Sequence, residues 1–243
     1  MPTFPFVREL LGWNGGNPNI ADRSSAGSRA ISECLLEALG ATQSVQHTGQ
    51  TAGMALEVAV RDHLASTLPA RLHGCRVEVS RRTAISDFGQ YAHLAKLERL
   101  IKADATGTLR ASIGTDYEIK PDVTVGLASA SSPLPFLHAA VQCKWTLRSD
   151  RAQNVRHDAV ILIRHRRGRL PHIVPVTAEP MPTRLASLAR GTAEVDTLYH
   201  VALDELDLAV RARGSAQQIE TLDELVTHDR LRDLSELVPT LLL

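Results

Sequence analysis

The stretch AAVQCKWTLRSDR, residues 139–151, decides how this chain folds. Its first seven residues alternate, so the side chains of Val141 and Cys143 face one side of an extended strand while those of Gln142 and Lys144 face the other. The second half is polar and rich in arginine, and we expect a helix to begin within it. A buried strand that leads into a helix predicts an α/β architecture.

Hydrophobic periodicity extends this prediction in both directions along the chain. Apolar residues at helical spacing predict that residues 1–105 are mostly helical, and short runs typical of β-strands follow them. Helices are expected over residues 29–39, 51–68, 91–101 and 184–190, and strands over residues 117–127, 139–145, 159–164 and 172–176. We therefore expect one domain of 243 residues, with a central mixed β-sheet and a recognition helix in residues 106–210 and a helical part in residues 211–243.

The composition narrows the class of protein. The chain has no apolar run of the length that crosses a membrane, and its first ten residues lack the layout of a signal peptide, so we expect a cytoplasmic protein. The three cysteines, Cys34, Cys75 and Cys143, are far apart in sequence and have no histidine cluster beside them. Neither a disulfide framework nor a structural zinc site is indicated.

Charge is balanced overall but unevenly distributed. The net charge is zero, which argues against a protein that coats nucleic acid nonspecifically. Residues 144–169 nevertheless carry eight Lys or Arg against two Asp, whereas residues 194–243 carry eleven acids against four arginines. The basic stretch is either a solvated surface or the electrostatic footprint of a DNA site.

Asp122, which follows Pro121, and Lys144 are the first candidates for chemistry. If the two strands that carry them pair, both side chains lie at one edge of the sheet. Hydrolytic nucleases need such a pair, because the carboxylate binds a divalent cation and the ammonium orients the attacking water or stabilises charge on the phosphate. The pattern alone is common in unrelated proteins, and the usual acid two residues before the lysine is replaced here by Gln142.

The residues after Lys144 carry a resemblance to a known family. CKWTLRSDR, residues 143–151, continuing as AQNVRHD, resembles the segment of NgoMIV-type restriction endonucleases in which RSDR begins four residues after the catalytic lysine. The similarity continues through residues 159–192 and more weakly back to the amino terminus. It implies a PD-(D/E)xK restriction-endonuclease-like fold and cleavage of double-stranded DNA at a site with a CCGG core, such as GCCGGC.

The resemblance also implies the catalytic residues. In the family, the acid that is absent two residues before the lysine lies instead on the helix that follows the lysine strand. Asp158 stands at that position here, where the family commonly has glutamate. Glu57 matches a further acid on an upstream helix; its alternative is an exposed pair with Arg61, one turn away. Asp122, Asp158, Glu57 and Cys143 are the expected metal-binding positions, for two Mg²⁺ ions and no organic cofactor. We expect a metal-activated water to attack the phosphodiester in line and leave 5′-phosphate and 3′-hydroxyl ends.

The RSDR segment supplies the groups that read C:G pairs. Arginine donates two hydrogen bonds to guanine and aspartate accepts from cytosine N4, so a symmetric homodimer or homotetramer would read both halves of CCGG. The resemblance adds Gln50 as a minor-groove probe and Asp22 as an acceptor for an outer cytosine. The expected DNA-binding residues are Arg148, Ser149, Asp150, Arg151, Gln50 and Asp22. Alternatively, Ser149 caps a helix and the charges form a surface salt bridge.

Other functions stay open on the sequence alone. A repair or junction nuclease of the same fold would keep Asp122 and Lys144 without a base-reading segment. A DNA-binding protein with a degenerate metal site would fit Gln142, and a helical partner-binding protein would fit only the first hundred residues and the acidic tail. A version directed to 5-methylcytosine is a further alternative, because N4 stays available on the methylated base.

Overall fold

A six-stranded mixed sheet forms the centre of the molecule. In the computed structural model, residues 4–42, 49–128, 130, 132–191 and 194–242 are described. The strand order is β3-β4-β5-β6-β7-β8; neighbours pair antiparallel from β3 to β5 and parallel from β5 to β8. The strands are β3 (Arg76–Arg81), β4 (Val123–Ala128), β5 (Phe136–Lys144), β6 (His172–Thr177), β7 (Leu198–His200) and β8 (Leu231–Asp233). A small antiparallel pair, β1 (Trp13–Asn14) and β2 (Asn17–Pro18), lies outside this sheet.

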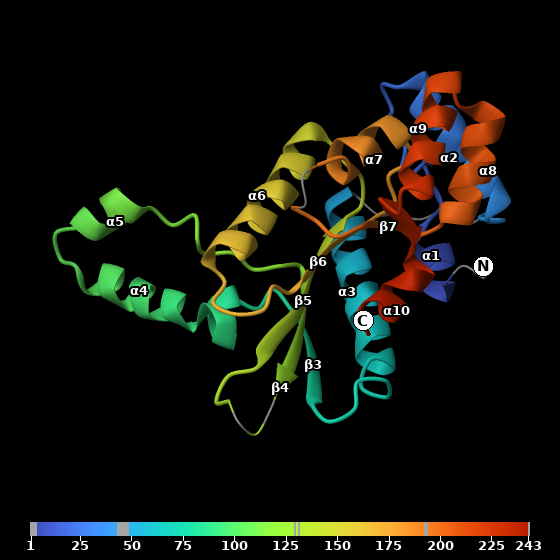
Figure 1. Cartoon of the computed structure of the whole chain (residues 1–243). Helices are drawn as coiled ribbons and strands as arrows, with labels where there is room; N and C mark the ends of the chain where they lie inside the picture. Colours follow the sequence, from blue (N-terminus) through green and yellow to red (C-terminus); the bar gives the residue numbers. More distant parts are fainter. Residues whose placement is uncertain (1–3, 43–48, 129, 131, 192–193, 243) are drawn as a thin grey trace.

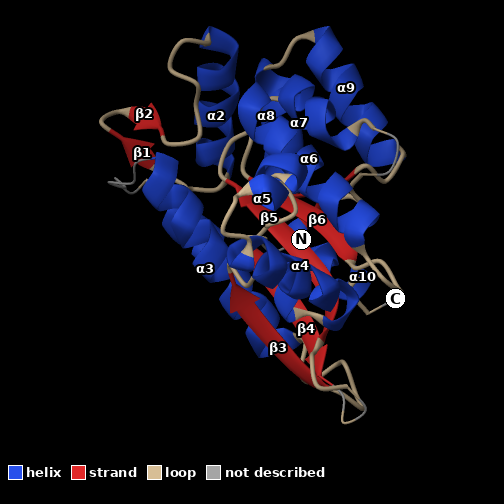
Figure 2. Cartoon of the chain, turned by 90° about the vertical axis from the view of Figure 1, so that its left-hand side faces the viewer, coloured by secondary structure: helices blue, strands red, loops and turns tan. Residues whose placement is uncertain are grey.

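Helices cover the sheet on both sides, as predicted for an α/β protein. Figure 1 places α3 and α6 on opposite sides of the strands, and a group of helices (α2, α7, α8 and α9) beyond one end of the sheet. The helices are α1 (Pro5–Leu10), α2 (Ala26–Ala38), α3 (Gly49–Thr67), α4 (Ala92–Ala103), α5 (Thr108–Ile113), α6 (Ser149–His165), α7 (Pro182–Ala189), α8 (Leu203–Arg213), α9 (Ala216–Thr227) and α10 (Leu237–Thr240). In Figure 1, α4 and α5 form an arm that projects from the body on the α6 side, and in Figure 2 this arm points toward the viewer.

The sequence of β5 explains its central position. Every residue from Leu137 to Cys143 is buried, as expected for a strand covered on both faces. Val123 of β4 pairs with Val141 of β5, so Asp122 comes opposite the end of β5 that carries Lys144. The next six-residue strand, β6, runs parallel to β5, with Lys144 beside Thr177. The two predicted site residues therefore meet at one edge of the sheet.

The prediction of a strand over residues 159–164 was wrong. These residues form the last turns of α6, which continues without a break from Ser149 to His165. Ala152, Val155, Ala159 and Leu162 are buried at helical spacing, so the apolar run continues a stripe that began upstream. Arg164 and His165 in the last turn also favour a helix end. The arginine-rich segment around Gly168 is consequently a helix-to-strand loop and not a hairpin turn.

The remaining differences concern short strands. The expected strand over residues 117–127 begins only at Val123, and the sequence did not predict β3, β7 or β8. The helices expected near residues 29–39, 51–68, 91–101 and 184–190 are present as α2, α3, α4 and α7. One hydrophobic cluster extends from Val7 in α1 to Leu241 near the carboxyl end, and all three cysteines are free.

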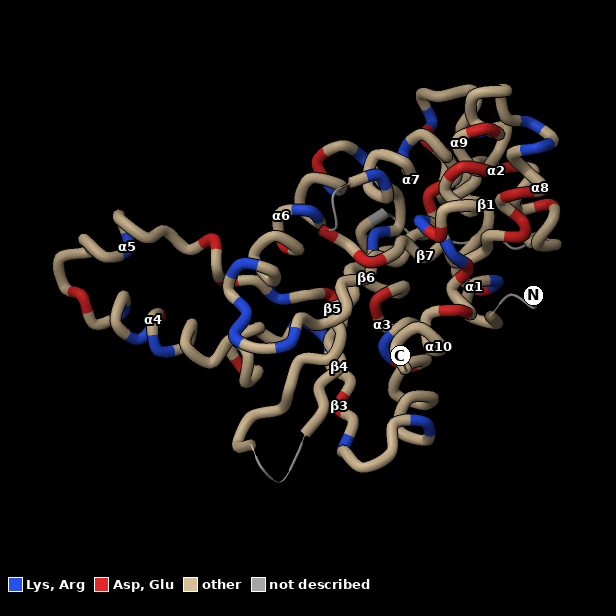
Figure 3. The backbone as a smooth tube through the Cα atoms, in the orientation of Figure 1, with Lys and Arg blue, Asp and Glu red and all other residues tan. Residues whose placement is uncertain are grey.

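The basic and acidic residues lie in separate regions of the folded molecule, as their distribution in the sequence predicts. Figure 3 shows Lys and Arg along the loop after α6, and Asp and Glu over α8 and α9. No helix within the described ranges is both long and apolar enough to span a membrane.

Candidate active site

Lys144 and Asp122 lie side by side, as predicted. The Lys144 Nζ lies 2.6 Å from Asp122 Oδ2, and both side chains are mostly buried. The backbone N–H of Cys143 donates to the same carboxylate oxygen at 2.8 Å. Because Asp122 ends the segment before β4 and Lys144 ends β5, the antiparallel pairing of these strands holds the two charges together.

Gln142 connects this pair to Asp158. Its Oε1 accepts from Lys144 Nζ at 3.2 Å, and its Nε2 donates to Asp158 Oδ2 at 2.9 Å. The residue that replaces the usual acid therefore keeps a structural place in the site. It joins a carboxylate on α6 to the strand carrying the lysine, and a chain of polar contacts runs from Asp122 to Asp158.

The electrostatic environment of this chain of polar contacts suits a hard cation. Burial raises the pKa of Asp158, and the nearby charge of Asp122 raises it further, although Lys144, Gln142 and His157 act in the opposite direction. Positive charge in the site is thus insufficient to offset the burial of this carboxylate. Asp122 and Asp158 offer only oxygen donors, which Mg²⁺ prefers. Within the described part of the chain, however, no three His, Cys, Asp or Glu side chains form a group that could hold a metal ion.

Glu57, the upstream acid, is held by two arginines that the sequence analysis did not single out. Its carboxylate accepts from Arg81 at 2.7 Å and from Arg82 at 3.0 and 3.2 Å, and it makes no exposed pair with Arg61. Burial by itself would raise the pKa of Glu57, but the hydrogen bonds and charges of Arg82 and Arg81 outweigh burial and lower it. Arg82 has φ +53°, and its backbone N–H donates to the carbonyl of Asp122. Arg82 therefore contacts both the Glu57 carboxylate and the backbone of Asp122, and it connects these two residues.

Cys143 lies within the core at the end of β5. Its side chain is 4% exposed, and burial raises the pKa of its thiol well above the usual value. A buried, protonated thiol is a poor metal ligand, because cysteine binds metals as the thiolate. What Cys143 contributes to the site in this structure is its backbone N–H, which fixes Asp122.

The RSDR segment forms the start of α6, as predicted. Arg148 occupies the N-cap position without a side-chain capping bond, and Ser149 is the first helical residue. In the described ranges neither Arg148 nor Asp150 has an ion-pair partner, and both are exposed. This excludes the alternative of a capping Ser149 with a surface salt bridge. Arg151 is oriented differently, because its guanidinium donates to the carbonyl and the hydroxyl of Thr146.

Asp22 lies beside this segment together with Arg184, which the sequence analysis did not identify. The two side chains form an ion pair, and the pKa of Asp22 is lowered by hydrogen bonds from Ser24 first and then from Arg184. A pocket of about 450 Å³ is lined by Asp22, Arg184, Arg148 and Asp150. We call these four residues the reading surface, because three of them, Asp22, Arg148 and Asp150, are predicted to contact bases. They come from the amino-terminal segment, α6 and α7, and only folding brings them together.

Gln50 and the arginine-rich loop lie outside the reading surface. Gln50 is exposed in the first turn of α3, and the described contacts do not join it to the reading surface. Arg164 and Arg166 lie at the opposite end of α6, which spans roughly 25 Å at 1.5 Å per residue over its 17 residues. Arg166 donates to the carbonyl of Ile163.

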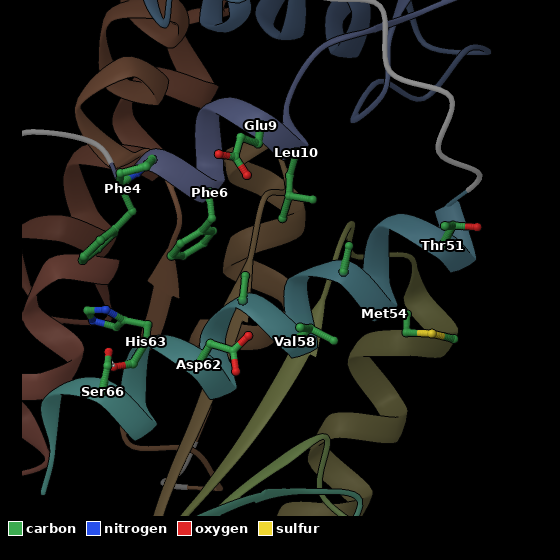
Figure 4. A pocket seen from close by; sticks show the side chains of 13 residues that line it. Phe4, Phe6, Glu9, Leu10, Thr51, Met54, Val58, Asp62, His63 and Ser66 are labelled. Carbon is green, nitrogen blue, oxygen red and sulfur yellow. Dashed lines mark hydrogen bonds between the residues drawn. The ribbon is translucent and has the colours of Figure 1, made fainter.

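A larger pocket of about 900 Å³ is separate from these residues. It lies between α1 and α3, as Figure 4 shows, and its lining includes Phe4, Phe6, Met54 and Val58. The lining is mostly apolar, and it includes none of the residues in the chain of polar contacts that runs from Asp122 to Asp158. The volume of a pocket therefore does not lead to the predicted catalytic residues in this molecule.

Comparison with known proteins agrees with the geometry. The family model for the NgoMIV restriction enzyme matches residues 12–129 and 124–242 of the chain. The type II restriction enzyme NgoMIV of Neisseria gonorrhoeae is 35% identical over 257 aligned positions, which cover 92% of this chain and 89% of that protein. The mixed sheet flanked by helices is consistent with the restriction-endonuclease-like fold. The chain therefore belongs to the NgoMIV restriction enzyme family and is a type II site-specific deoxyribonuclease.

Proposed function

We propose that this enzyme cleaves double-stranded DNA at a site with a CCGG core, flanked as in GCCGGC, and that it depends on Mg²⁺. The observation that supports the proposal is the short separation between Lys144, the predicted catalytic residue, and Arg148, the first residue predicted to contact a base. Lys144 ends β5, and Arg148, the N-cap residue of α6, follows four residues later, so a phosphate near Lys144 and a base edge near Arg148 belong to the same stretch of DNA. The positive end of the α6 dipole also favours a phosphate there.

The catalytic residues have distinct tasks in this proposal. Asp122 and Asp158 would hold Mg²⁺, with Glu57 as a carboxylate for a second ion once Arg81 or Arg82 releases it. A bound Mg²⁺ supplies Lewis-acid stabilisation of the phosphate and lowers the pKa of a water. Lys144 donates to a phosphate oxygen or orients the attacking water, and Gln142 keeps Lys144 and Asp158 at their present spacing. The products are 5′-phosphate and 3′-hydroxyl ends.

Recognition uses the reading surface. Arg148 donates to guanine and Asp150 accepts from cytosine N4 in the core. Asp22 and Arg184 form a second pair with the same two chemistries, which suits a C:G pair outside the core. Arg151 and Gln50 would complete the contacts from the major and minor grooves. A palindromic site is read by a symmetric homodimer, or by a homotetramer that holds two such sites.

Cleavage of plasmid DNA tests this function. Plasmid with many CCGG sites, unmethylated and cytosine-methylated in parallel, is incubated with Mg²⁺ or with EDTA, and the ends are mapped. Discrete Mg²⁺-dependent cuts at one CCGG-core sequence are expected, and the two substrates reveal the effect of methylation. Sequence-independent cutting would favour a repair or junction nuclease. Specific binding without cutting would indicate a DNA-binding protein and refute the catalytic proposal.

A further inference from the structure

A fully buried carboxylate, Glu179, lies next to the reading surface. It stands between β6 and α7, and its side chain is 0% exposed. Its Oε2 accepts the backbone N–H of Leu147 at 2.7 Å, and its Oε1 accepts the backbone N–H of Met181 at 3.1 Å. Neither the cleavage chemistry nor the base contacts described above use this residue.

The two N–H groups belong to the segments that carry the reading surface. Leu147 immediately precedes Arg148, and Met181 is the N-cap residue of α7, whose Arg184 pairs with Asp22. Leu147 is itself buried, so its N–H would lack an acceptor without Glu179. One carboxylate therefore fixes the start of α6 relative to the start of α7.

Three further titratable groups lie close to Glu179. Arg184 Nη1 is 3.8 Å from Oε1, and its charge, like the hydrogen bonds from Leu147 and Met181, favours the ionised carboxylate. The charge of Asp22 and, above all, burial favour the protonated form, and together they raise the pKa of Glu179 to about 7. His200 contacts the Glu179 backbone and stays neutral, because burial lowers its pKa to about 4.

We propose that Glu179 is a positioning residue that holds Arg148 and Arg184 in one geometry, so that discrimination at the outer base pair depends on its two hydrogen bonds to backbone N–H groups. This inference rests on the proposed function. The ionised carboxylate offers an acceptor to both N–H groups, whereas protonation places a hydrogen on one oxygen and weakens one of the two bonds. The reading surface then loosens as the pH falls below neutrality.

Glu179→Gln tests the inference, because glutamine carries one oxygen acceptor and one N–H donor, much like the protonated acid. Two duplexes are compared, one containing GCCGGC and one in which only the outer pair is changed. The ratio of kcat/KM for the two duplexes is measured on both sides of pH 7, and the ratio of Kd values is measured with Ca²⁺. The wild-type ratios are expected to fall about tenfold as the pH falls, because one base contact is weakened. Glu179→Gln should show the low ratios at every pH.

Glu194→Gln is the matched control, since Glu194 faces Arg156 and makes no contact with the reading surface. It should keep the wild-type ratios at every pH. Ratios in Glu179→Gln that equal those of wild type above pH 7, or equal slowing of both duplexes, would overturn the inference.

If wild type cuts neither duplex, the proposed function fails, and the Kd ratios still decide the role of Glu179. Lost discrimination would support it, and unchanged discrimination would exclude it. The wild-type pH profile needs no substitution, so a variant that fails to fold does not remove the test.

Discussion

Replacing Glu179 with glutamine is expected to increase the free energy of unfolding above neutral pH. In the folded enzyme burial raises the pKa of Glu179 to about 7, whereas the ordinary value is 4.5. The folded state therefore binds more protons than the unfolded state between these two values, and stability falls as the pH rises through that window. The two pKa values differ by about 2.5, and a difference of one is worth about 1.4 kcal/mol, which gives about 3 kcal/mol.

The assay is urea denaturation at a series of pH values from 4.5 to above 7 for wild type and Glu179→Gln. The quantity of interest is the difference between the two unfolding free energies, because other titrating groups contribute to both proteins. Near pH 4.5 glutamine and the protonated acid should be nearly equivalent. Above pH 7 the variant should be more stable by about 3 kcal/mol. A variant that is less stable than wild type above pH 7, or a difference that does not change with pH, would refute the reasoning.

Glu57→Gln is a control with the opposite sign. Both glutamates are buried, but Arg82 and Arg81 lower the pKa of Glu57 below its ordinary value. Ionised Glu57 therefore stabilises the folded state at and above pH 4.5, and this contribution is lost as the pH falls through the folded pKa. Glu57→Gln should accordingly be destabilised at neutral pH, where Glu179→Gln is stabilised. If both variants were stabilised, Arg82 and Arg81 would not outweigh burial at Glu57; if both were destabilised, the burial cost inferred for Glu179 would be wrong.

The other predictions concern cleavage and recognition. Lys144→Met should reduce the cleavage rate by about 10²- to 10³-fold with little loss of DNA binding, measured by single-turnover cleavage and by gel shift with Ca²⁺; an equal loss of both would contradict a catalytic role. Asp150→Asn should reduce discrimination against a changed core cytosine by about 1–3 kcal/mol, measured as a ratio of Kd values, whereas Glu194→Gln should leave it unchanged. Gln142→Ala removes a hydrogen bond that lowers the pKa of Asp158, so the acidic limb of the pH–rate profile should move to higher pH, and an unmoved limb would exclude this role.

Local sequence information predicted the parts of the site that are close together in the chain. Lys144 and the RSDR segment are separated by only a few residues, and a strand that leads into a helix fixes their relative positions. Asp122 could be placed beside Lys144 because two strands joined by a short loop pair antiparallel. The run of residues 159–164 was misread for the converse reason, because a short apolar run fits a strand as well as the buried stripe of a helix.

The tertiary structure alone decided the contacts between distant segments. Arg184 pairs with Asp22 across 162 positions of sequence. Arg81, the last residue of a strand that the sequence did not predict, and Arg82, which follows it, both contact Glu57. Periodicity and spacing specify which face of an element is buried, but they carry no information on which buried or half-buried charges meet. The sequence by itself therefore determined the α/β class, the contact between Asp122 and Lys144, and the helix that begins within the RSDR segment. Only the packing of α3, β3, β6 and α7 decided how Glu57, Asp22 and Glu179 are held, because those contacts depend on the relative position of elements far apart in the chain.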